Sequence, residues 1–301
     1  MNILNKLIAA ILPIVPKSIV RKVSSRYIAG PVLPDAIRVV RELNGEGAMA
    51  TVDVLGEYIK SLDEAEENTR YSIEVLNGIQ QEQVTSNLSI KLTSLGLGLD
   101  HAACERNVRR ILDTARTTNN FVRFDMEDSQ YTTLTIDLYA KLRKEYDNVG
   151  VVLQAYLRRT EADIKSLLAG GKTNIRLCKG IYIEPESIAF QERKEVQDHF
   201  LRCLEVAIAG GAYTGIATHD DVLIDGARSL ISQCGLAPAQ YEFQMLLGVR
   251  DQKRRELLRE GHRLRVYVPF GADWYGYSVR RLKENPAIAG HIVKALFTGG
   301  K

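Results

Sequence analysis

Cysteine, histidine and tryptophan are scarce in this chain, which has four, five and one of them among 301 residues. The cysteines are widely spaced, form no C-x-x-C pair and have no histidines beside them in a ligand pattern. They predict reduced thiols in the core of a cytosolic protein, not a disulfide framework or a zinc site. These residues are Cys104, Cys178, Cys203 and Cys234.

Long apolar runs are also missing, because none reaches the roughly 18 residues that a membrane span needs. The N-terminal stretch MNILNKLIAAILPIVPKSIVRKV is apolar, but Lys6, Pro13 and Pro16 interrupt it. No small-residue cleavage site of a signal peptide follows it. Two interpretations remain equal: a helix docked on the protein body, or an interfacial membrane helix with basic residues facing lipid head groups. Those residues are Lys6, Lys17, Arg21 and Lys22.

The excess of positive charge is small, at a formal net charge of +3, and no dense Lys/Arg run is interleaved with aromatic residues. Nucleic acid is therefore not an expected partner. No G-x-G-x-x-G follows a strand pattern, since SLGLGLD lacks the third glycine, and there is no Walker A motif. The sequence thus argues against a Rossmann or P-loop nucleotide site.

Short β-branched or apolar runs alternate with longer helix-patterned segments from about residue 48 onward. Eight runs qualify as strands: AMATVDVLG, NLSIKLTSLG, FVRFDMED, VGVVLQAYL, NIRLCKGIYI, YTGIATHD, YEFQMLLG and HRLRVYVPF. Eight βα units in about 250 residues suit a closed parallel barrel, whereas an open doubly wound sheet normally has fewer strands. We therefore predict an α/β fold, a (βα)8 TIM-like barrel over residues 46–301 behind an N-terminal helical segment, residues 1–45.

Each predicted strand ends in or beside a polar side chain. In such a barrel, active sites lie at the carboxyl ends of the strands. Lys91 and Asp125 each lie between apolar neighbours, so strand alternation points their charges away from the helix-facing side. One such residue is usually structural, but a complete ring indicates the lining of a site that would also hold any cofactor. The ring consists of Asp53, Lys91, Asp125, Gln154, Arg176, His219, Gln244 and Tyr267.

A second polar cluster lies near the C-terminus, in YGYSVRRLKE. On a helix, residues three and four apart share a face, so Tyr277, Arg280, Arg281 and Glu284 would converge on one patch. By itself this pattern is typical of a solvated amphipathic face. The alternative is a site for an anionic ligand, for which two adjacent guanidinium groups are well suited.

The strand-end motifs, taken in order, resemble those of the proline dehydrogenases, in particular the monofunctional bacterial enzymes. The likeness runs from about Val32 to Phe297 through SIKL, FDMED, QAYLRR, RLCKGIYIEP, ATHD, EFQML, RVYVPFG and RRLKENP. The resemblance implies a distorted (βα)8 barrel, noncovalently bound FAD and oxidation of L-proline to 1-pyrroline-5-carboxylate, the first step of proline catabolism to glutamate. No aldehyde dehydrogenase domain follows, so we expect this step alone.

The resemblance also assigns the substrate's carboxylate to cationic residues. Arg280 and Arg281 would grip it, because planar guanidinium forks match its two oxygens. Lys91 would add a third positive contact, restrained by Asp125, and Glu284 would orient the arginine pair.

The apolar ring of proline would be walled by Tyr267, Tyr277 and Leu246, which would place its C5 hydrogen against the flavin. Tyr277 favours proline over hydroxyproline as the substrate, because a phenol at that position would crowd a ring hydroxyl.

For the flavin, the resemblance implies seven contact residues: Gln154, Arg176, Lys179, Gly180, Thr218, His219 and Gln244. Arg176 would donate toward N5 of the isoalloxazine ring, and Gly180 would permit close approach of the phosphate-bearing tail. His219 would bond the flavin instead of taking a proton from the substrate. Without the resemblance, His219 is better explained as a satisfied rim histidine, and Lys179 as a solvated lysine.

Three positions depart from the family's pattern. Ile181 stands where alanine is usual, Asp220 where many members have asparagine, and Gly276 where proline is common. None of them removes a group with an assigned role, but the branched Ile181 leaves the flavin contacts of its loop open.

The resemblance further implies a cytoplasmic enzyme that passes electrons to membrane quinone, with its amphipathic N-terminus in peripheral contact with the inner membrane face. Two other functions remain open. A Schiff-base lyase could use Lys91 or Lys179 as a desolvated nucleophile. A degenerate barrel could sense proline or FAD without turnover, for which Ile181 is the only hint.

Overall fold

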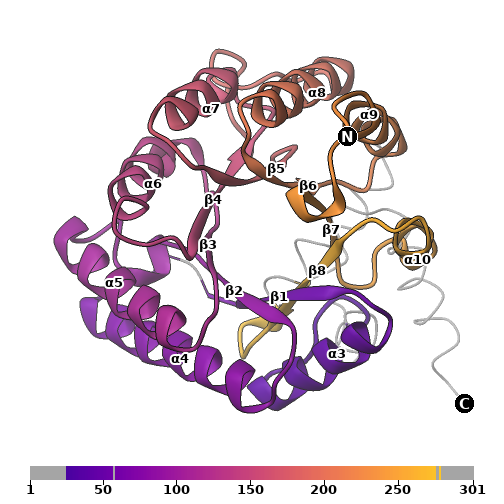
Figure 1. Cartoon of the computed structure of the whole chain (residues 1–301). Coiled ribbons are helices and arrows are strands. Elements are labelled where there is room, and N and C mark those ends of the chain that lie inside the picture. The colour runs from indigo at the N-terminus through magenta and orange to yellow at the C-terminus, as the bar shows by residue number, and fades with distance from the viewer. Residues whose placement is uncertain (1–24, 57, 276–277, 279–301) are drawn as a thin grey trace, which may run out of the picture.

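The computed structural model describes residues 25–56, 58–275 and 278. Eight parallel strands close into a barrel in chain order (Figure 1). They are β1 (Met49–Val54), β2 (Ser86–Ile90), β3 (Val122–Phe124), β4 (Val149–Gln154), β5 (Asn174–Cys178), β6 (Tyr213–Ala217), β7 (Tyr241–Leu246) and β8 (Leu264–Phe270). Strand β8 pairs with β1 from Met49↔Arg265 to Val54↔Phe270 and so completes the ring. The predicted α/β barrel is confirmed.

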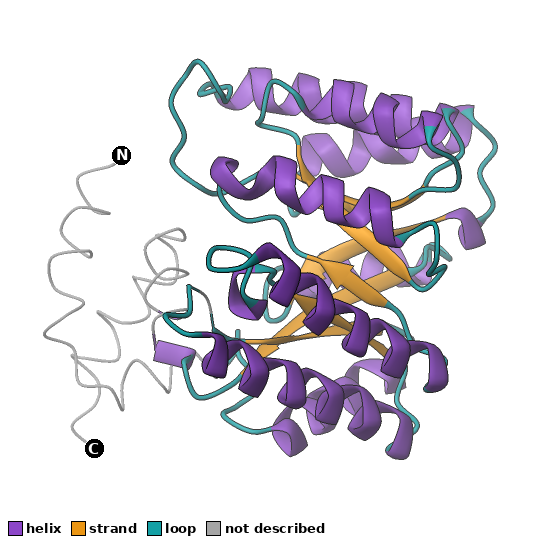
Figure 2. Ribbon diagram, turned by 90° about the vertical axis from the view of Figure 1, so that its left-hand side faces the viewer, coloured by secondary structure: helices purple, strands orange, loops and turns teal. Residues whose placement is uncertain are grey.

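Helices surround the strands on the outside of the barrel, as the side view shows (Figure 2). They are α3 (Leu33–Gly45), α4 (Leu62–Gln81), α5 (His101–Thr117), α6 (Ser129–Leu142), α7 (Thr160–Ala169), α8 (Arg193–Ala209), α9 (Asp221–Gln233) and α10 (Asp251–Arg259). Two short 3-10 helices, η2 (Thr93–Leu95) and η3 (Pro238–Gln240), lie in connections. Among the residues described, no helix is both long and apolar enough to cross a membrane.

Strand alternation separates an apolar outer face of the sheet from a polar interior. Residues of one parity, such as Val52, Leu88 and Phe124, belong to the core between strands and helices and are fully buried. Residues of the other parity bond to one another across the inside, as Tyr213 does to Glu242 at 2.8 Å. The barrel interior is therefore filled with polar side chains, and it is these that reach its two ends.

Local signals explain where helices begin. Ser61 caps α4 by accepting a hydrogen bond from the Glu64 amide at 3.3 Å, and Asp100 caps α5 by accepting one from the Ala103 amide at 2.9 Å. Helix α4 therefore begins at Leu62 and α5 at His101. The run predicted as a strand through Gly96 ends at Ile90, because η2 turns the chain.

Helix α3 lies within the segment that we separated from the barrel by sequence. Its apolar face packs on β1 and β8, which makes it part of the outer ring of helices between α4 and α10 (Figure 1). The rest of the predicted N-terminal helix, residues 1–24, lies outside the described residues, so its docked and interfacial interpretations remain predictions.

The four cysteines are unpaired, as expected. Cys104 and Cys203 are buried in the core, which confirms the prediction for them. It is wrong for the other two: Cys234 is exposed because it caps the solvent-facing end of α9, and Cys178 is half-buried at the end of β5.

Candidate active site

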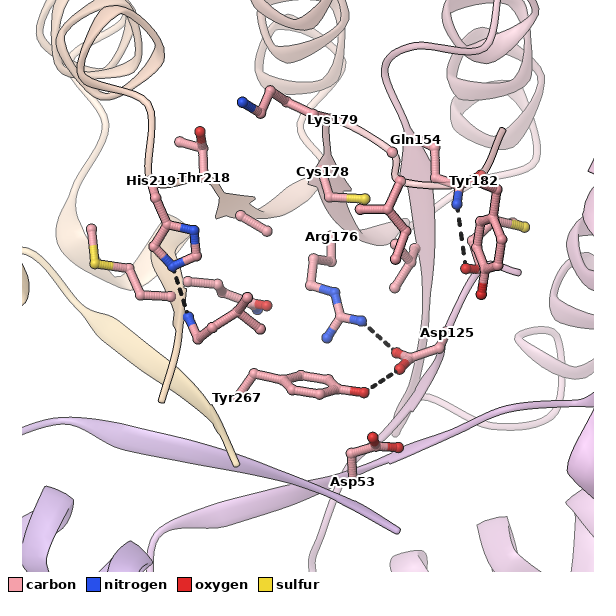
Figure 3. Close-up of a pocket in the computed structure, with 18 of the residues that line it drawn as sticks. Asp53, Asp125, Gln154, Arg176, Cys178, Lys179, Tyr182, Thr218, His219 and Tyr267 are labelled. Atoms are coloured by element: carbon pink, nitrogen blue, oxygen red, sulfur yellow. Dashed lines mark hydrogen bonds and ion pairs between the residues drawn. The ribbon is translucent and has the colours of Figure 1, made fainter. Parts of the chain in front are cut away.

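A cavity of about 390 Å³ lies at the carboxyl ends of the strands (Figure 3). All eight polar residues of the ring inferred from strand alternation line it: Asp53, Lys91, Asp125, Gln154, Arg176, His219, Gln244 and Tyr267. Lys179, Gly180, Ile181, Thr218, Asp220 and Leu246 line it as well. The barrel thus gathers residues that are spread over 200 positions of the chain, because parallel strands bring all their carboxyl ends to one rim.

Asp125 is the centre of a buried network on one side of this cavity. Figure 3 shows Arg176 and Tyr267 both pointing toward its carboxylate. The Tyr267 hydroxyl donates to Oδ2 at 2.6 Å, while Arg176 and Ser89 donate to Oδ1. The guanidinium of Arg176 also lies over the Tyr267 ring, 5.1 Å from its centroid. Both Asp125 oxygens therefore have partners inside the barrel.

The surrounding groups determine which members of this network are charged. Burial alone would raise the pKa of Asp125, but the charges of Arg176 and Lys91 and the hydrogen bonds from Ser89 and Tyr267 lower it below its usual value. Burial and the neighbouring carboxylates raise the pKa of Tyr267 well above its usual value. At neutral pH the network is thus an ionised carboxylate that accepts from a guanidinium and a neutral phenol.

Lys91 is restrained by a different carboxylate from the one expected. Its Nζ lies 2.5 Å from Oδ1 of Asp53, in a pair whose side chains are only 10% and 2% exposed. Asp125 forms its own ion pair with Arg176. The expectation that Asp125 restrains Lys91 is therefore corrected: Lys91 pairs with Asp53, and Asp125 contributes a nearby charge.

Three expected flavin contacts form bonds within the protein. The Nε2 atom of His219 accepts a hydrogen bond from the Leu246 amide at 2.9 Å, which leaves the proton of the neutral ring on Nδ1. Gln244 donates to Oε1 of Glu242 at 2.6 Å, deeper in the barrel. Thr218 accepts from the Asp220 amide at 3.1 Å. Each of the three has a structural role whether or not a cofactor binds.

Gln154 differs from these residues, because its amide is only partly satisfied. Its Nε2 donates weakly to the Met126 carbonyl at 3.4 Å, and its buried Oε1 has no hydrogen-bond partner. A buried acceptor without a donor is costly, and such an atom at a cavity wall suits a ligand that carries an N–H or O–H.

Gly180 is required by the packing of the protein, apart from any contact with a cofactor. Its φ is +103°, and a Cβ there would overlap the ring of Tyr156. The requirement for glycine thus comes from the protein's own packing. The preceding Lys179 lies 3.5 Å from Asp220 with its side chain 42% exposed, at the rim of the cavity.

The unusual residues of this rim occupy defined places. Ile181 lines the cavity and is 50% exposed, so it projects at the mouth instead of filling the floor. Asp220 caps α9 by accepting from the Val222 amide at 3.2 Å, and its other oxygen accepts from Gln197 and Arg193 at 3.0 and 3.1 Å. The carboxylate at position 220 therefore joins α8 to α9.

Sequence reasoning missed several contributors to the cavity. Asp53 was recognised in the ring but received no role, and two lining residues, Cys178 and Tyr182, were not assigned to the site. Ser89, which donates to Asp125, was not singled out. Their positions held a usable signal: Ser89 and Cys178 have the same strand parity as Lys91 and Arg176. The residues predicted from the C-terminal cluster, Tyr277, Arg280, Arg281 and Glu284, lie outside the described residues, as does Gly276.

Comparisons with known proteins agree on one family. The family model described as proline dehydrogenase matches residues 36–294. Proline dehydrogenase 2 of Bacillus subtilis strain 168 is 40% identical over 267 residues, which cover 89% of this chain and 88% of that protein. Proline dehydrogenase of Deinococcus radiodurans is 34% identical over 281 residues, which cover 92% and 90%.

Among solved structures, proline utilization A (PutA) from Bdellovibrio bacteriovorus, inactivated by N-propargylglycine, superposes with a TM-score of 0.83 at 23% identity. The match covers 88% of this chain but only 33% of that one. At this level of identity it shows a shared fold: the barrel here corresponds to one part of a longer protein.

Proposed function

The chain belongs to the proline dehydrogenase family, and we propose that it oxidises L-proline to 1-pyrroline-5-carboxylate with noncovalently bound FAD. Membership makes it an oxidoreductase and implies a flavin cofactor in general terms. The observation that carries the proposal is the complete ring of strand-end polar residues around one cavity, in a chain that aligns with its relatives over about nine-tenths of their length.

The residues of the cavity fit a flavin. Its volume of about 390 Å³ is within the roughly 300–1,000 Å³ usual for small-molecule sites. The unpartnered Oε1 of Gln154 suits a ring N–H, and Lys179 at the rim suits a phosphate. When bound, FAD supplies the acceptor for the two electrons and the hydrogen that leave proline. We assign its binding to Gln154, Arg176, Lys179, Gly180, Thr218, His219 and Gln244.

The charges of the cavity support a role for further cationic residues, besides Lys91, in binding the substrate's carboxylate. Lys91 and Arg176 each already have a buried carboxylate partner, Asp53 and Asp125 respectively. Lys91 alone would therefore attract an anion only weakly. We assign the remaining positive charge to Arg280 and Arg281, with Glu284 orienting them. These roles remain predictions from the sequence.

Tyr267 and Leu246 would position the ring of proline, together with Tyr277. Because the raised pKa of Tyr267 keeps its phenol neutral, we assign it a wall and hydrogen-bonding role, not that of a base. The Schiff-base alternative loses support at Lys91, which is held in a buried ion pair with Asp53. It also loses support at Lys179, whose side chain is 42% exposed and so is not desolvated.

Anaerobic titration of the purified protein with L-proline tests this proposal. We expect a yellow protein whose flavin absorbance bleaches stoichiometrically as proline is oxidised. A preparation that stays colourless and inert after FAD and proline are added would contradict the proposal. Binding of proline without bleaching would instead support the sensor alternative.

The same titration on Arg281→Lys tests the carboxylate assignment. Lysine keeps the charge but loses the planar fork, so we expect proline binding to weaken tenfold or more, an effect of about 1.4 kcal/mol or above. An unchanged titration would reject the assignment.

We further propose that the electrons pass to membrane quinone and that the enzyme is cytoplasmic, in peripheral contact with the inner membrane face. Anaerobic mixing of the proline-reduced protein with a soluble quinone should restore the flavin absorbance. Co-sedimentation with anionic vesicles should depend on residues 1–24. Failure to reoxidise would reject the first statement, and sedimentation that is unaffected by removing that segment would reject the second.

A further inference from the structure

The ion pair between Asp53 and Lys91 is the most buried lysine pair of the described barrel, and it lies on the cavity lining. Asp53 is near the end of β1 and pairs in register with Ser89 of β2. Lys91 follows Ser89 by two residues and so has the same side-chain direction, one step closer to the rim. Lys91 thus lines the cavity with its ammonium tied to the neighbouring strand.

Stability does not explain such a pair. Two charges removed from water lose more solvation than their attraction usually returns, and apolar residues of similar volume often serve a core equally well. Asp53 shows the cost directly, because its Oδ2 is buried and has no hydrogen-bond partner. The pair therefore requires an explanation in terms of what Lys91 does at the cavity.

We propose that Asp53 is a positioning residue for substrate binding: it fixes the Lys91 ammonium, charged and in place, for the carboxylate of L-proline. This inference rests on the proposed function. Without Asp53, the lysine side chain would lose this ion-pair partner, and more of its ordering would fall to the substrate, at a cost in rotamer entropy. Desolvation of Lys91 would also oppose its charge.

Asp125 cannot take over this task in the observed arrangement. Its Oδ1 accepts from Arg176 and Ser89, and its Oδ2 accepts from Tyr267. The two carboxylates thus divide the two cations between them. A direct contact of the unpartnered Asp53 Oδ2 with the substrate's ring nitrogen is the competing role, and it would operate without Lys91.

A double-mutant cycle on the flavin-loaded, full-length protein separates these roles. The variants are Asp53→Asn, Lys91→Met and the two combined. Affinity is measured from flavin spectral changes for L-proline and for cyclopentanecarboxylate, which has the same ring size and carboxylate but no nitrogen. KM and kcat for proline are measured alongside, with flavin content and thermal midpoint as controls for folding.

We expect Asp53→Asn to weaken the binding of both ligands tenfold or more and to raise KM more than it lowers kcat. In the Lys91→Met background, the added Asp53→Asn change should alter either affinity less than twofold. Equal losses with and without Lys91, or a loss for proline but not for cyclopentanecarboxylate, would overturn the inference in favour of direct contact. Unchanged or tighter binding in Asp53→Asn would also overturn it, because removal of the Asp53 charge would then outweigh any loss of positioning.

Lys91→Arg gives a second test that does not depend on the folding of Asp53→Asn. It keeps the cation but changes its length and shape, so we expect weaker binding of both ligands. Wild-type affinity in Lys91→Arg would contradict a positioning requirement. A wild-type protein that neither binds nor oxidises proline would refute the proposed function itself. If proline bleaches the flavin of the wild type but Asp53→Asn binds both ligands with wild-type affinity, only this inference is refuted.

Discussion

Single side chains in the cavity owe their ionisation to their partners. Asp125 stays ionised because Arg176 and Lys91 lie beside it, and Tyr267 stays neutral because burial and two nearby carboxylates raise its pKa. The same principle governs Cys178 on the cavity wall, where burial raises the pKa of the thiol to about 11. Its nucleophilic form is therefore rare at neutral pH, despite a neighbouring arginine.

Alkylation of the native protein by iodoacetamide at pH 7.5 should follow exposure and thiolate fraction. We expect exposed Cys234 to react first and Cys178 much more slowly. Cys104 and Cys203 should react only after unfolding, since burial raises both pKa values to about 12. Mass spectrometry of the labelled peptides gives the order. Labelling of Cys178 as fast as Cys234 would contradict the assignment of an inert thiol.

The connection after β5 places strict demands on its backbone. Gly180 adopts a left-handed φ of +103° directly against Tyr156, whose amide donates to the Lys179 carbonyl at 2.8 Å. This connection carries Lys179 and Ile181 to the cavity mouth. Its shape is therefore set by packing between β4 and β5, and the cavity depends on that packing.

Gly180→Ala should disturb this connection, and Gly171→Ala provides a matched control. Both glycines have a φ near +105°, but a Cβ at Gly171 meets nothing within 4 Å. The control should lose only about 1–2 kcal/mol of unfolding free energy, from backbone strain. Gly180→Ala should lose more and should also bind FAD less tightly, as measured by denaturant unfolding and flavin titration. Equal losses in the two variants would mean that contact with Tyr156 is unimportant.

Polar side chains line the interior of the barrel at both of its ends. Opposite the candidate site, a second cavity of about 550 Å³ is lined by Arg123, Glu242 and Arg265 among others. Glu242 accepts from Arg265 Nε at 2.7 Å and from the Tyr213 hydroxyl at 2.8 Å. Since conserved function in such barrels belongs to the other end, this cluster is best understood as joining β6, β7 and β8.

Glu242 makes the stability of the molecule depend on pH. Burial would raise its pKa, but Arg265, Tyr213 and Arg123 lower it below the ordinary 4.5. A carboxyl whose folded pKa is lowered stabilises the fold above its unfolded pKa, and this contribution is lost as the pH falls through the folded value. The unfolding free energy should thus decrease as the pH falls below about 4.5.

Glu242→Gln tests this dependence. It leaves Arg265 buried without its counter-ion, so we expect a loss of about 3–5 kcal/mol at pH 7 and a flatter pH profile below 4.5. Glu66→Gln is the control, because Glu66 pairs with Arg110 at the surface and should contribute less than about 1 kcal/mol. Urea unfolding at several pH values measures both. Parallel profiles for Glu242→Gln and wild type would contradict the assignment.

Much of this architecture follows from the sequence by itself. The period-two pattern of each strand run determined which side chains enter the barrel, because alternation requires no knowledge of neighbouring strands. It therefore predicted the eight strands and the ring from Asp53 to Tyr267 that lines the cavity. The ordered motifs predicted the family, which the family match confirms.

The partners of each side chain in hydrogen bonds, ion pairs and packing follow only from the folded structure. Lys91 pairs with Asp53 and not with Asp125, His219 accepts from a backbone amide, and Gly180 makes room for Tyr156. Cross-strand partners depend on the stagger of neighbouring strands and on side-chain rotamers, and no local pattern encodes either. The physical reason is that periodicity specifies a direction for each side chain, whereas a contact also needs a distance, which exists only once the barrel has closed.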